Sequence, residues 1–517
     1  MNNKTNWTDD VLTTIRRLYN SIKYTIGVGI KINISRFFLD YLKFKKFIEN
    51  QKVEKVETTD DKKICIAVIP WDGSAVPWYS ITLALMLYKK GKNVFILSDD
   101  IPFGDDELFH KVQSKLIFKI LKKLPIKLIK LSDYKSLERS SSEIRYLSKL
   151  NSIHYTHGET NQALRESYEG IVEKQLNPIY SKIASLYKEE NFTQIISPGG
   201  IWGTSGIFPL FAEKYNTQIT TYDSGEDCLV MNIYGVAAQV KDFPYSFDKL
   251  LKDSQEKNFA IEKGQEQLQK RRAGNDILSY FPATTNISEF GNDYYLLLLN
   301  SAWDSATLGL HTVYDTMIDW MFDSIEWVLN NTNKTIIIRQ HPEERTETLN
   351  NTDSYKKEIK NRFNKNKRVI FIEAKKDINT YDLIENSLCV IGFSSTIIVE
   401  SVVLGKPAII VSSTYYANYG IVYNANSKKE YYEYLQKASY KELKITQDMK
   451  DKASISNYIT QTCNWYETKF TPVRENYFAW CKLTLEELEK DYLPLEAILK
   501  NTPLSILQHE NNFKDVK

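Results

Sequence analysis

The sequence has few cysteines and histidines, and neither residue type forms a pattern that is known to hold a metal. The five cysteines are scattered and odd in number, with no C-x-x-C pair among them. The six histidines form neither an H-x-x-x-H nor an H-E-x-x-H pattern. These absences argue against disulfides and against zinc, and they favour free thiols in a reducing compartment.

Long apolar runs are absent as well. The longest fall far short of the ~20 residues that a membrane-spanning helix needs, and the N-terminus lacks a cleavable signal pattern. The formal net charge is only +2, so overall charge supplies no argument for nucleic-acid binding. We therefore expect a cytoplasmic protein that spans no membrane and binds no nucleic acid.

The sequence does contain short apolar runs that alternate with helical stretches, in a first half and again in a second. Strands are expected at residues 64–69, 93–97, 194–197 and 218–222, and then at residues 294–299, 335–339, 369–372, 388–393 and 408–411. This alternation is typical of parallel sheets, and the length suffices for two domains. The predicted fold is α/β, with two Rossmann-like domains facing each other across a cleft.

The predicted domain boundaries follow this repeat. Residues 1–58 are expected to form a basic helical N-terminal segment. Residues 59–285 should form one Rossmann-like domain, and residues 286–475 the other. Residues 476–517 are expected to be a helical tail that packs back on the first domain.

The stretch from Leu388 to Val411 carries the clearest chemical signal. An apolar strand is followed by Ser394-Ser395-Thr396, then by an apolar helix that ends at Gly405-Lys406-Pro407. The start of such a helix lies at the carboxyl end of a strand, where free N–H groups and the helix dipole favour an anion. The stretch therefore indicates either a phosphate site or an ordinary strand–helix–strand unit with a well-capped helix.

A second motif, His341-Pro342, precedes this stretch by about fifty residues. Together with Tyr381, Glu400 and the glycine–lysine–proline turn, it resembles the capsule polysaccharide biosynthesis glycosyltransferases over roughly residues 290 to 435. Related blocks occur in teichoic-acid polymerases and in nucleotide-sugar 2-epimerases. The resemblance implies a GT-B-like fold, in which the first domain binds an acceptor and the second a nucleotide sugar.

By the same resemblance, His341 and the serine block would hold the donor phosphates, and Glu400 would accept hydrogen bonds from the ribose. No D-x-D triplet occurs, which agrees with a site that uses no metal and no cofactor besides the donor substrate. The expected nucleotide-sugar-binding residues are Trp303, Asp304, Arg339, His341, Pro342, Tyr381, Ser394, Ser395, Thr396 and Glu400. The alternative for His341 is a structural histidine at a strand end, and Arg339 could instead face solvent.

The predicted function is that of a metal-independent glycosyltransferase. It would move a sugar from a nucleotide-sugar donor to a growing surface glycan of capsular or lipopolysaccharide type. Two alternatives stay open: a CDP-polyol phosphotransferase of teichoic-acid type, and a non-catalytic GT-B-like subunit of glycan assembly. A catalytic carboxylate in the cleft distinguishes an enzyme from a binding subunit, which needs none.

An inverting transfer needs a base within reach of the acceptor hydroxyl, and three loops of the first half offer a carboxylate. Asp72 directly follows the first expected strand and has Trp71 beside it, so it is the first choice. Glu159 lies in a His-Gly-Glu-Thr sequence. Asp223 ends a strand, with Glu226 three residues later. Asp72 could equally be a turn or helix-capping residue, and Asp223 could instead hold the hinge between the domains.

Two stretches combine lysine or arginine with apolar residues, one near residues 16–46 and one near residues 111–130. The alternative to a functional role is a solvated helix face. As a functional feature, two such stretches favour peripheral contact with the anionic inner leaflet of a membrane. A glycan or lipid-linked acceptor would be found there.

Overall fold

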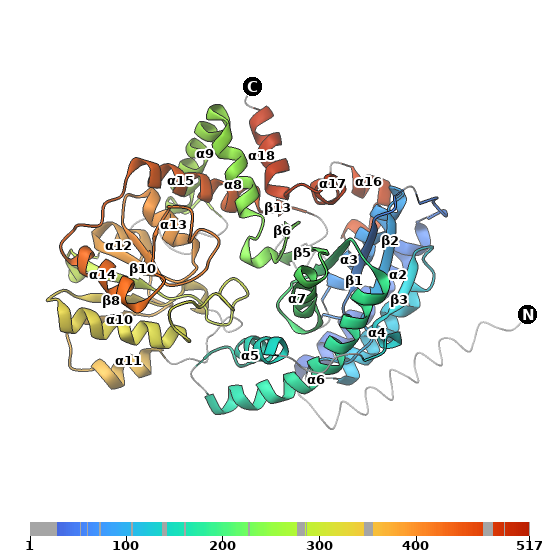
Figure 1. Ribbon diagram of the computed structural model, residues 1–517, viewed down its shortest axis with the longest axis horizontal. Helices are drawn as coiled ribbons and strands as arrows, with labels where there is room; N and C mark the ends of the chain where they lie inside the picture. The colour runs from blue at the N-terminus through green and yellow to red at the C-terminus, as the bar shows by residue number, and fades with distance from the viewer. Residues whose placement is uncertain are drawn as a thin grey trace, which may run out of the picture.

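The computed structural model describes residues 28–51, 53–58, 60–71, 74–104, 107–136, 142–159, 162–225, 228–276, 285, 287–345, 355–468, 479–490 and 492–515. These residues form two sheets, each with helices on both faces, and Figure 1 shows the two units side by side. The α/β prediction of two Rossmann-like domains is confirmed, and the described part of the N-terminal segment is helical (α2, Val28–Asn50).

The first sheet has the strand order β13-β6-β5-β4-β1-β2-β3. Its strands are β1 (Lys63–Val68), β2 (Asn93–Ser98), β3 (Lys127–Lys130), β4 (Gln194–Pro198), β5 (Gln218–Gly225), β6 (Cys228–Asn232) and β13 (Tyr466–Glu467). β6 and β13 are antiparallel to their neighbours, and the others are parallel. The order reverses between β1 and β4, so the carboxyl ends of these strands lie at a topological switch point.

Alternate residues of β1 point into two cores. Ile64, Ile66 and Val68 pack with α2, α3 (Val76–Lys89) and α4 (Glu107–Leu121). Cys65 and Ala67 pack on the opposite face with α5 (Ser142–Thr156), α6 (Gln162–Glu190) and α7 (Ile207–Lys214). Strands buried on both faces explain why the sequence shows continuous apolar runs there.

The second sheet has the order β12-β11-β10-β7-β8-β9, and all its pairs are parallel. Its strands are β7 (Tyr294–Leu298), β8 (Ile336–Arg339), β9 (Val369–Ile372), β10 (Ser387–Gly392), β11 (Ala408–Ile410) and β12 (Tyr423–Asn424). The chain runs outward from β7 to β9 and returns at β10. The switch point of this sheet therefore lies at the carboxyl ends of β7 and β10.

Helices from distant parts of the sequence cover the second sheet. One face carries α10 (Met317–Asn331), α11 (Tyr355–Phe363) and α14 (Lys428–Ser439). The other carries α8 (Phe243–Lys252), α9 (Ser254–Arg272), α12 (Thr380–Asn386), α13 (Thr396–Val403) and α15 (Gln447–Tyr458). Packing therefore assigns α8 and α9 to the second sheet, although the predicted boundary at residue 285 places them with the first domain.

The C-terminal tail contains α16 (Leu485–Glu489), α17 (Leu493–Lys500) and α18 (Leu504–Lys514). Its beginning packs in the core of the first domain, where the Trp480 ring lies 5.1 Å from that of Phe47. The hydroxyls of Tyr79 and Tyr492 are 2.7 Å apart. The last helix reaches the second domain, since the His509 and Phe259 ring centroids are 6.0 Å apart.

The basic stretch near residues 111–130 is not one helix. After α4 the chain turns at Leu124-Pro125 and continues as β3, whose lysines lie on the outermost strand of the first sheet. Lysines on an edge strand discourage further strand pairing. No helix within the described ranges is long and apolar enough to cross a membrane.

Candidate functional site

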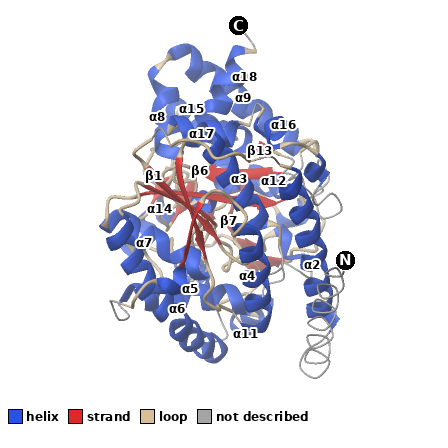
Figure 2. Ribbon diagram, turned by 90° about the vertical axis from the view of Figure 1, so that its right-hand side faces the viewer, coloured by secondary structure: helices blue, strands red, loops and turns tan. Residues whose placement is uncertain are grey.

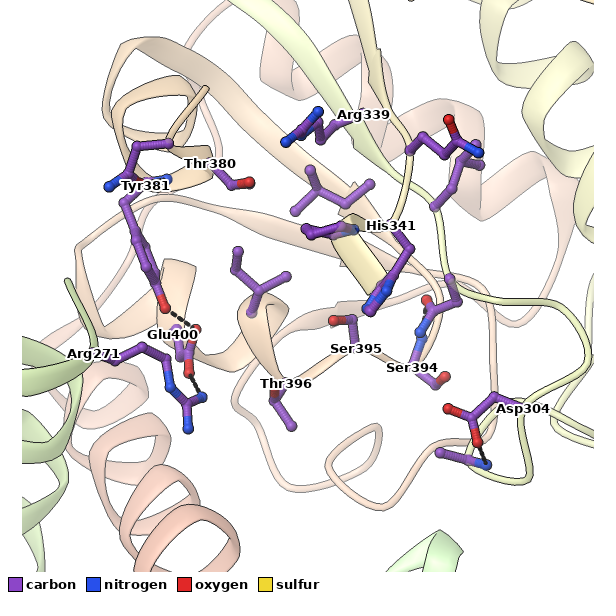
Figure 3. Close-up of a pocket in the computed structure, with 18 of the residues that line it drawn as sticks. Arg271, Asp304, Arg339, His341, Thr380, Tyr381, Ser394, Ser395, Thr396 and Glu400 are labelled. Carbon is purple, nitrogen blue, oxygen red and sulfur yellow. Dashed lines mark hydrogen bonds and ion pairs between the residues drawn. The ribbon is translucent and has the colours of Figure 1, made fainter. Parts of the chain in front are cut away.

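A cavity of about 310 Å³ opens at the switch point of the second sheet. We call it the helix-end cavity, because the start of α13 forms part of its wall (Figure 3). Nine of the ten residues expected to bind the nucleotide sugar line it: Asp304, Arg339, His341, Pro342, Tyr381, Ser394, Ser395, Thr396 and Glu400. They lie close together because β8 and β10 flank β7, and the loops that follow these strands begin at the same edge of the sheet.

The serine block leaves donors open at the start of α13. Ser395 occupies the N-cap position, yet its side chain makes no capping bond. Within the described residues, the hydroxyls of Ser395 and Thr396 make no hydrogen bond. The Ser394 N–H donates to Asn300 Oδ1 at 3.3 Å. Because the hydroxyls do not cap the helix, they and the first free N–H groups suit an anion.

Two glycines set the position of α13. A Cβ on Gly392, at the end of β10, would lie 2.0 Å from the Ile398 Cδ1 atom, so a larger residue there would displace this buried side chain of the helix. Gly405 ends the helix with φ of +82°. Lys406 donates from Nζ to the Ser387 carbonyl at 3.1 Å. The glycine–lysine–proline turn is therefore structural, and Lys406 does not line the cavity.

Arg339 lines the cavity wall but its guanidinium is committed to the backbone. It is only 1% exposed and donates to the carbonyls of Glu373, Lys376 and Ile378. Burial lowers its pKa to about 10. The alternative that Arg339 faces solvent is wrong, because its buried guanidinium holds the loop that leads to Asn379 and Tyr381. A contribution of its charge to donor binding stays a prediction. His341, by contrast, is half-buried and borders the cavity above Ser395 (Figure 3).

Glu400 is held by two partners at the base of the cavity. Its Oε1 accepts from Arg271 Nη1 at 2.6 Å, and its Oε2 accepts from the Tyr381 hydroxyl at 2.7 Å. Burial, and then the Glu400 charge, hold the Tyr381 pKa well above its usual value. Each carboxylate oxygen can accept a second bond, so a ribose remains compatible with this arrangement. The sequence did not predict a role for Arg271, because this residue lies in a charged helix with no motif.

A second cavity, of about 480 Å³, lies between the two domains, and we call it the interdomain cavity. The second domain contributes Ser394 and Thr396, and the first contributes Asp223 and residues 237–240. Asp304, Ala306 and Trp465 line both cavities, as do Ser394 and Thr396. The two cavities therefore share a wall at the start of α13.

The carboxylates that were expected to act as a catalytic base lie in different places. Asp72 and Glu226 lie outside the described residues. Asp223 is exposed at the carboxyl end of β5 and lines the interdomain cavity. Glu159 is 5% exposed and lines neither cavity.

Glu159 instead connects the two domains. Its Oε2 accepts from the Met317 N–H at 2.7 Å, at the start of α10, and its Oε1 lies 3.5 Å from His311 Nε2. The His311 ring in turn lies 4.6 Å from that of Phe393, which precedes the serine block. The prediction of Glu159 as a base is corrected: a carboxylate at a helix N-terminus is stabilised by the helix dipole and here joins the domains.

Trp303 also belongs to this junction between the domains. Its ring stacks on that of His157 at 4.5 Å, and its carbonyl oxygen lies 3.3 Å from His154 Nδ1. It is the one expected nucleotide-sugar residue that does not line the helix-end cavity. The neighbouring Asp304 does, because the loop turns there: Asp304 Oδ1 accepts from the Ala306 N–H at 3.1 Å.

Within the described ranges, no three histidine, cysteine, aspartate or glutamate side chains gather in a way that could hold a metal ion. The predicted independence from metals and cofactors stays a prediction. His341 and the donors at the start of α13 line the helix-end cavity. Asp223 and Asp304 are carboxylates that border the neighbouring space.

Residues 251–459 match the family described as capsule polysaccharide biosynthesis protein. The resemblance seen in the sequence between roughly residues 290 and 435 is confirmed by this match. The matched stretch begins near the end of α8 and ends at the end of α15. It therefore coincides closely with the elements that pack on the second sheet. A search of curated proteins found no match.

Among solved structures, the chain is similar to two structures of KpsC from Thermosulfurimonas dismutans. The beta Kdo 2,7 transferase is 12% identical, with 53% of this chain and 79% of that chain covered and a TM-score of 0.31. The beta Kdo 2,4 transferase is 14% identical, with 52% and 80% covered and a TM-score of 0.33. UDP-GlcNAc 2-epimerase from Methanocaldococcus jannaschii is 13% identical, with 77% and 99% covered and a TM-score of 0.26. Scores this low carry no conclusion about function.

Proposed function

We propose that this protein is a glycosyltransferase that moves a sugar from a nucleotide-sugar donor to a growing surface glycan. The observation that carries the proposal is the shared wall of the two cavities. On one side lie a helix N-terminus, hydroxyls and His341, which together suit an anion. On the other side lies a space between the domains that is lined by Asp223. The match to capsule polysaccharide biosynthesis proteins supports the same class of reaction.

Each side chain has a role in this proposal. The donor phosphates bind at Ser394–Thr396 and His341, and these groups stabilise the negative charge that develops on the leaving phosphate. Glu400 accepts hydrogen bonds from the ribose while Arg271 and Tyr381 hold it in place. Asp223 removes the proton of the acceptor hydroxyl as that oxygen attacks the sugar.

The anion site is tested by binding, without any knowledge of the acceptor. The full-length protein should be stabilised against thermal unfolding by one class of nucleotide in a panel. A ligand at ~100 times its dissociation constant contributes ~2.7 kcal/mol. His341→Ala and Ser395→Ala should each weaken that nucleotide by about tenfold or more, since each removes a group that contacts phosphate.

Ser439→Ala, at the end of α14 and outside both cavities, is the matched control and should bind like the wild type. Unchanged nucleotide affinity in both His341→Ala and Ser395→Ala would contradict the anion site. A CDP-polyol that binds more tightly than every nucleotide sugar would instead favour a polyol phosphotransferase.

We propose further that the face formed by α2, α4 and β3 contacts an anionic membrane. The two helices pack side by side (Figure 2). Lys123, in the turn after α4, forms an ion pair of 3.1 Å with Glu49 of α2. Exposed lysines of this face lie beside exposed leucines, which are Leu39, Leu42 and Leu108. Lysines draw the surface toward anionic lipid, and apolar side chains enter the headgroup region.

Vesicle co-sedimentation tests this contact. Binding should rise with the fraction of anionic lipid and fall with salt, because each lysine near the surface contributes ~1 kcal/mol. Reversing Lys115, Lys119 and Lys122 to glutamate should reduce binding by about 100-fold or more by the same estimate. The equivalent reversal of the exposed Lys356, Lys357 and Lys360 on α11 is the control. Equal effects of the two triple variants would refute a specific face.

A further inference from the structure

Trp465 stands in the wall that the two cavities share. It lines both of them, and 37% of its surface is exposed. Within the described part of the chain, no aromatic ring or cationic side chain stacks on its indole. A broad aromatic face is therefore available at the point where the helix-end cavity meets the interdomain cavity.

The backbone on either side of Trp465 is anchored to different domains. Before it, the π-helix Ile459–Cys463 packs in the core of the second domain. After it, β13 pairs with β6 of the first sheet. Gln508 Nε2 donates to the carbonyls of Cys463 at 2.7 Å and Trp465 at 3.0 Å. π-Helical turns are frequent at functional sites, and this one sets the indole at the crossing between the domains.

Polar side chains of the same segment line the interdomain cavity together with Trp465. They are Thr460, Gln461 and Asn464. Gln461 Oε1 accepts from Arg271 Nη2 at 2.8 Å, and Asn464 Oδ1 lies 3.4 Å from Asn232 Nδ2. A sugar ring presents C–H groups on its faces and hydroxyls at its edge. An aromatic plane bordered by hydroxyl and amide groups complements both features.

The position of the proposed anion site indicates which part of the substrate contacts Trp465. Ser394 and Thr396 line both cavities, so a phosphate bound to them sits at the junction. A sugar attached to that phosphate extends into the interdomain cavity beside Trp465. We propose that the Trp465 indole stacks on the transferred sugar of the donor, an inference that rests on the proposed function and adds the residue that recognises the sugar itself.

Calorimetric titration of the full-length protein tests this stacking without an acceptor. UDP, GDP, dTDP and CMP are each titrated alongside a set of their sugar conjugates. In the wild type, the donor should bind more tightly than its bare nucleotide. Trp465→Ala should remove that gain, by about tenfold or more, and leave the affinity for the bare nucleotide unchanged. Trp465→Phe keeps a smaller aromatic face and should retain most of the gain.

Tyr440→Ala removes an exposed aromatic residue outside both cavities and serves as the control. Unchanged affinity for the bare nucleotide shows that Trp465→Ala is folded. A gain that survives in Trp465→Ala overturns the inference while the proposed function stands. A wild type that binds a nucleotide but gains nothing from any sugar also overturns it. A wild type that binds no nucleotide overturns the proposed function, and this inference with it.

Discussion

Replacing Asp223 with asparagine should lower turnover by about 10²–10⁴-fold at saturating donor, the range that a general base contributes. Asparagine keeps the size of the side chain but cannot take up a proton. Asp223 lies near the carboxyl end of β5 and lines the interdomain cavity together with Ser394 and Thr396. Its backbone pairs with Val230 of β6, so the substitution should leave the fold intact.

The affinity for the nucleotide should be the same in Asp223→Asn and the wild type, because the anion site lies on the other domain. The comparison variants are Asp72→Asn and Asp304→Asn. Asp72 is the base that the sequence favours, and Asp304 is a second carboxylate at the shared wall. If either loses turnover by orders of magnitude while Asp223→Asn keeps it, the base is not Asp223.

Replacing Arg271 with alanine should lower the free energy of unfolding of the second domain by about 3–5 kcal/mol, as expected when one partner of a buried ion pair is removed. The two side chains are 8% and 2% exposed in the pair between Arg271 and Glu400. Arg271 also donates to Asp276 and to Gln461. Burial opposes the charge on Arg271, but Glu400, Tyr381 and Asp276 outweigh it and raise its pKa.

The neighbouring arginine supplies a matched control. Arg272 pairs with Glu385 at 2.6 Å, but the two side chains are 34% and 46% exposed. Arg272→Ala should therefore cost no more than about 1 kcal/mol. Urea unfolding of both variants measures the difference. Arg271→Ala, Glu400→Gln and the double variant show whether the loss comes from the unpaired Glu400 charge, because the double variant should then lose less than the sum. Equal losses for Arg271→Ala and Arg272→Ala would contradict a buried pair.

The sequence alone predicts the helix-end cavity well because its parts are local. β10 (Ser387–Gly392) is a buried strand, and its apolar run is visible without any tertiary contact. His341 lies two residues after the end of β8, and the serine block begins two residues after the end of β10. Parallel strands of one sheet bring such loops to one edge, so a correct strand assignment suffices to bring these residues together.

The sequence does not predict the side-chain contacts of Arg339, Glu159 and Trp303. A charged or aromatic side chain at the end of a strand or in a loop has the same local pattern whether it faces a ligand or the protein. Arg339 turns to three backbone carbonyls, and Glu159 turns to the start of α10. Trp303 turns to His157. These choices depend on contacts between segments far apart in the chain.

The sequence by itself determined the two Rossmann-like units and the motifs at the ends of their strands, because hydrophobic periodicity and helix caps are properties of neighbouring residues. Only the tertiary structure decided how the units are joined. α9 comes from the connector between the halves and brings Arg271 to Glu400, while the crossing at residue 465 places Trp465 between two cavities. The physical reason is that packing between distant segments is stabilised by the burial of whole helix faces. A short stretch of sequence does not show which of these faces contact one another.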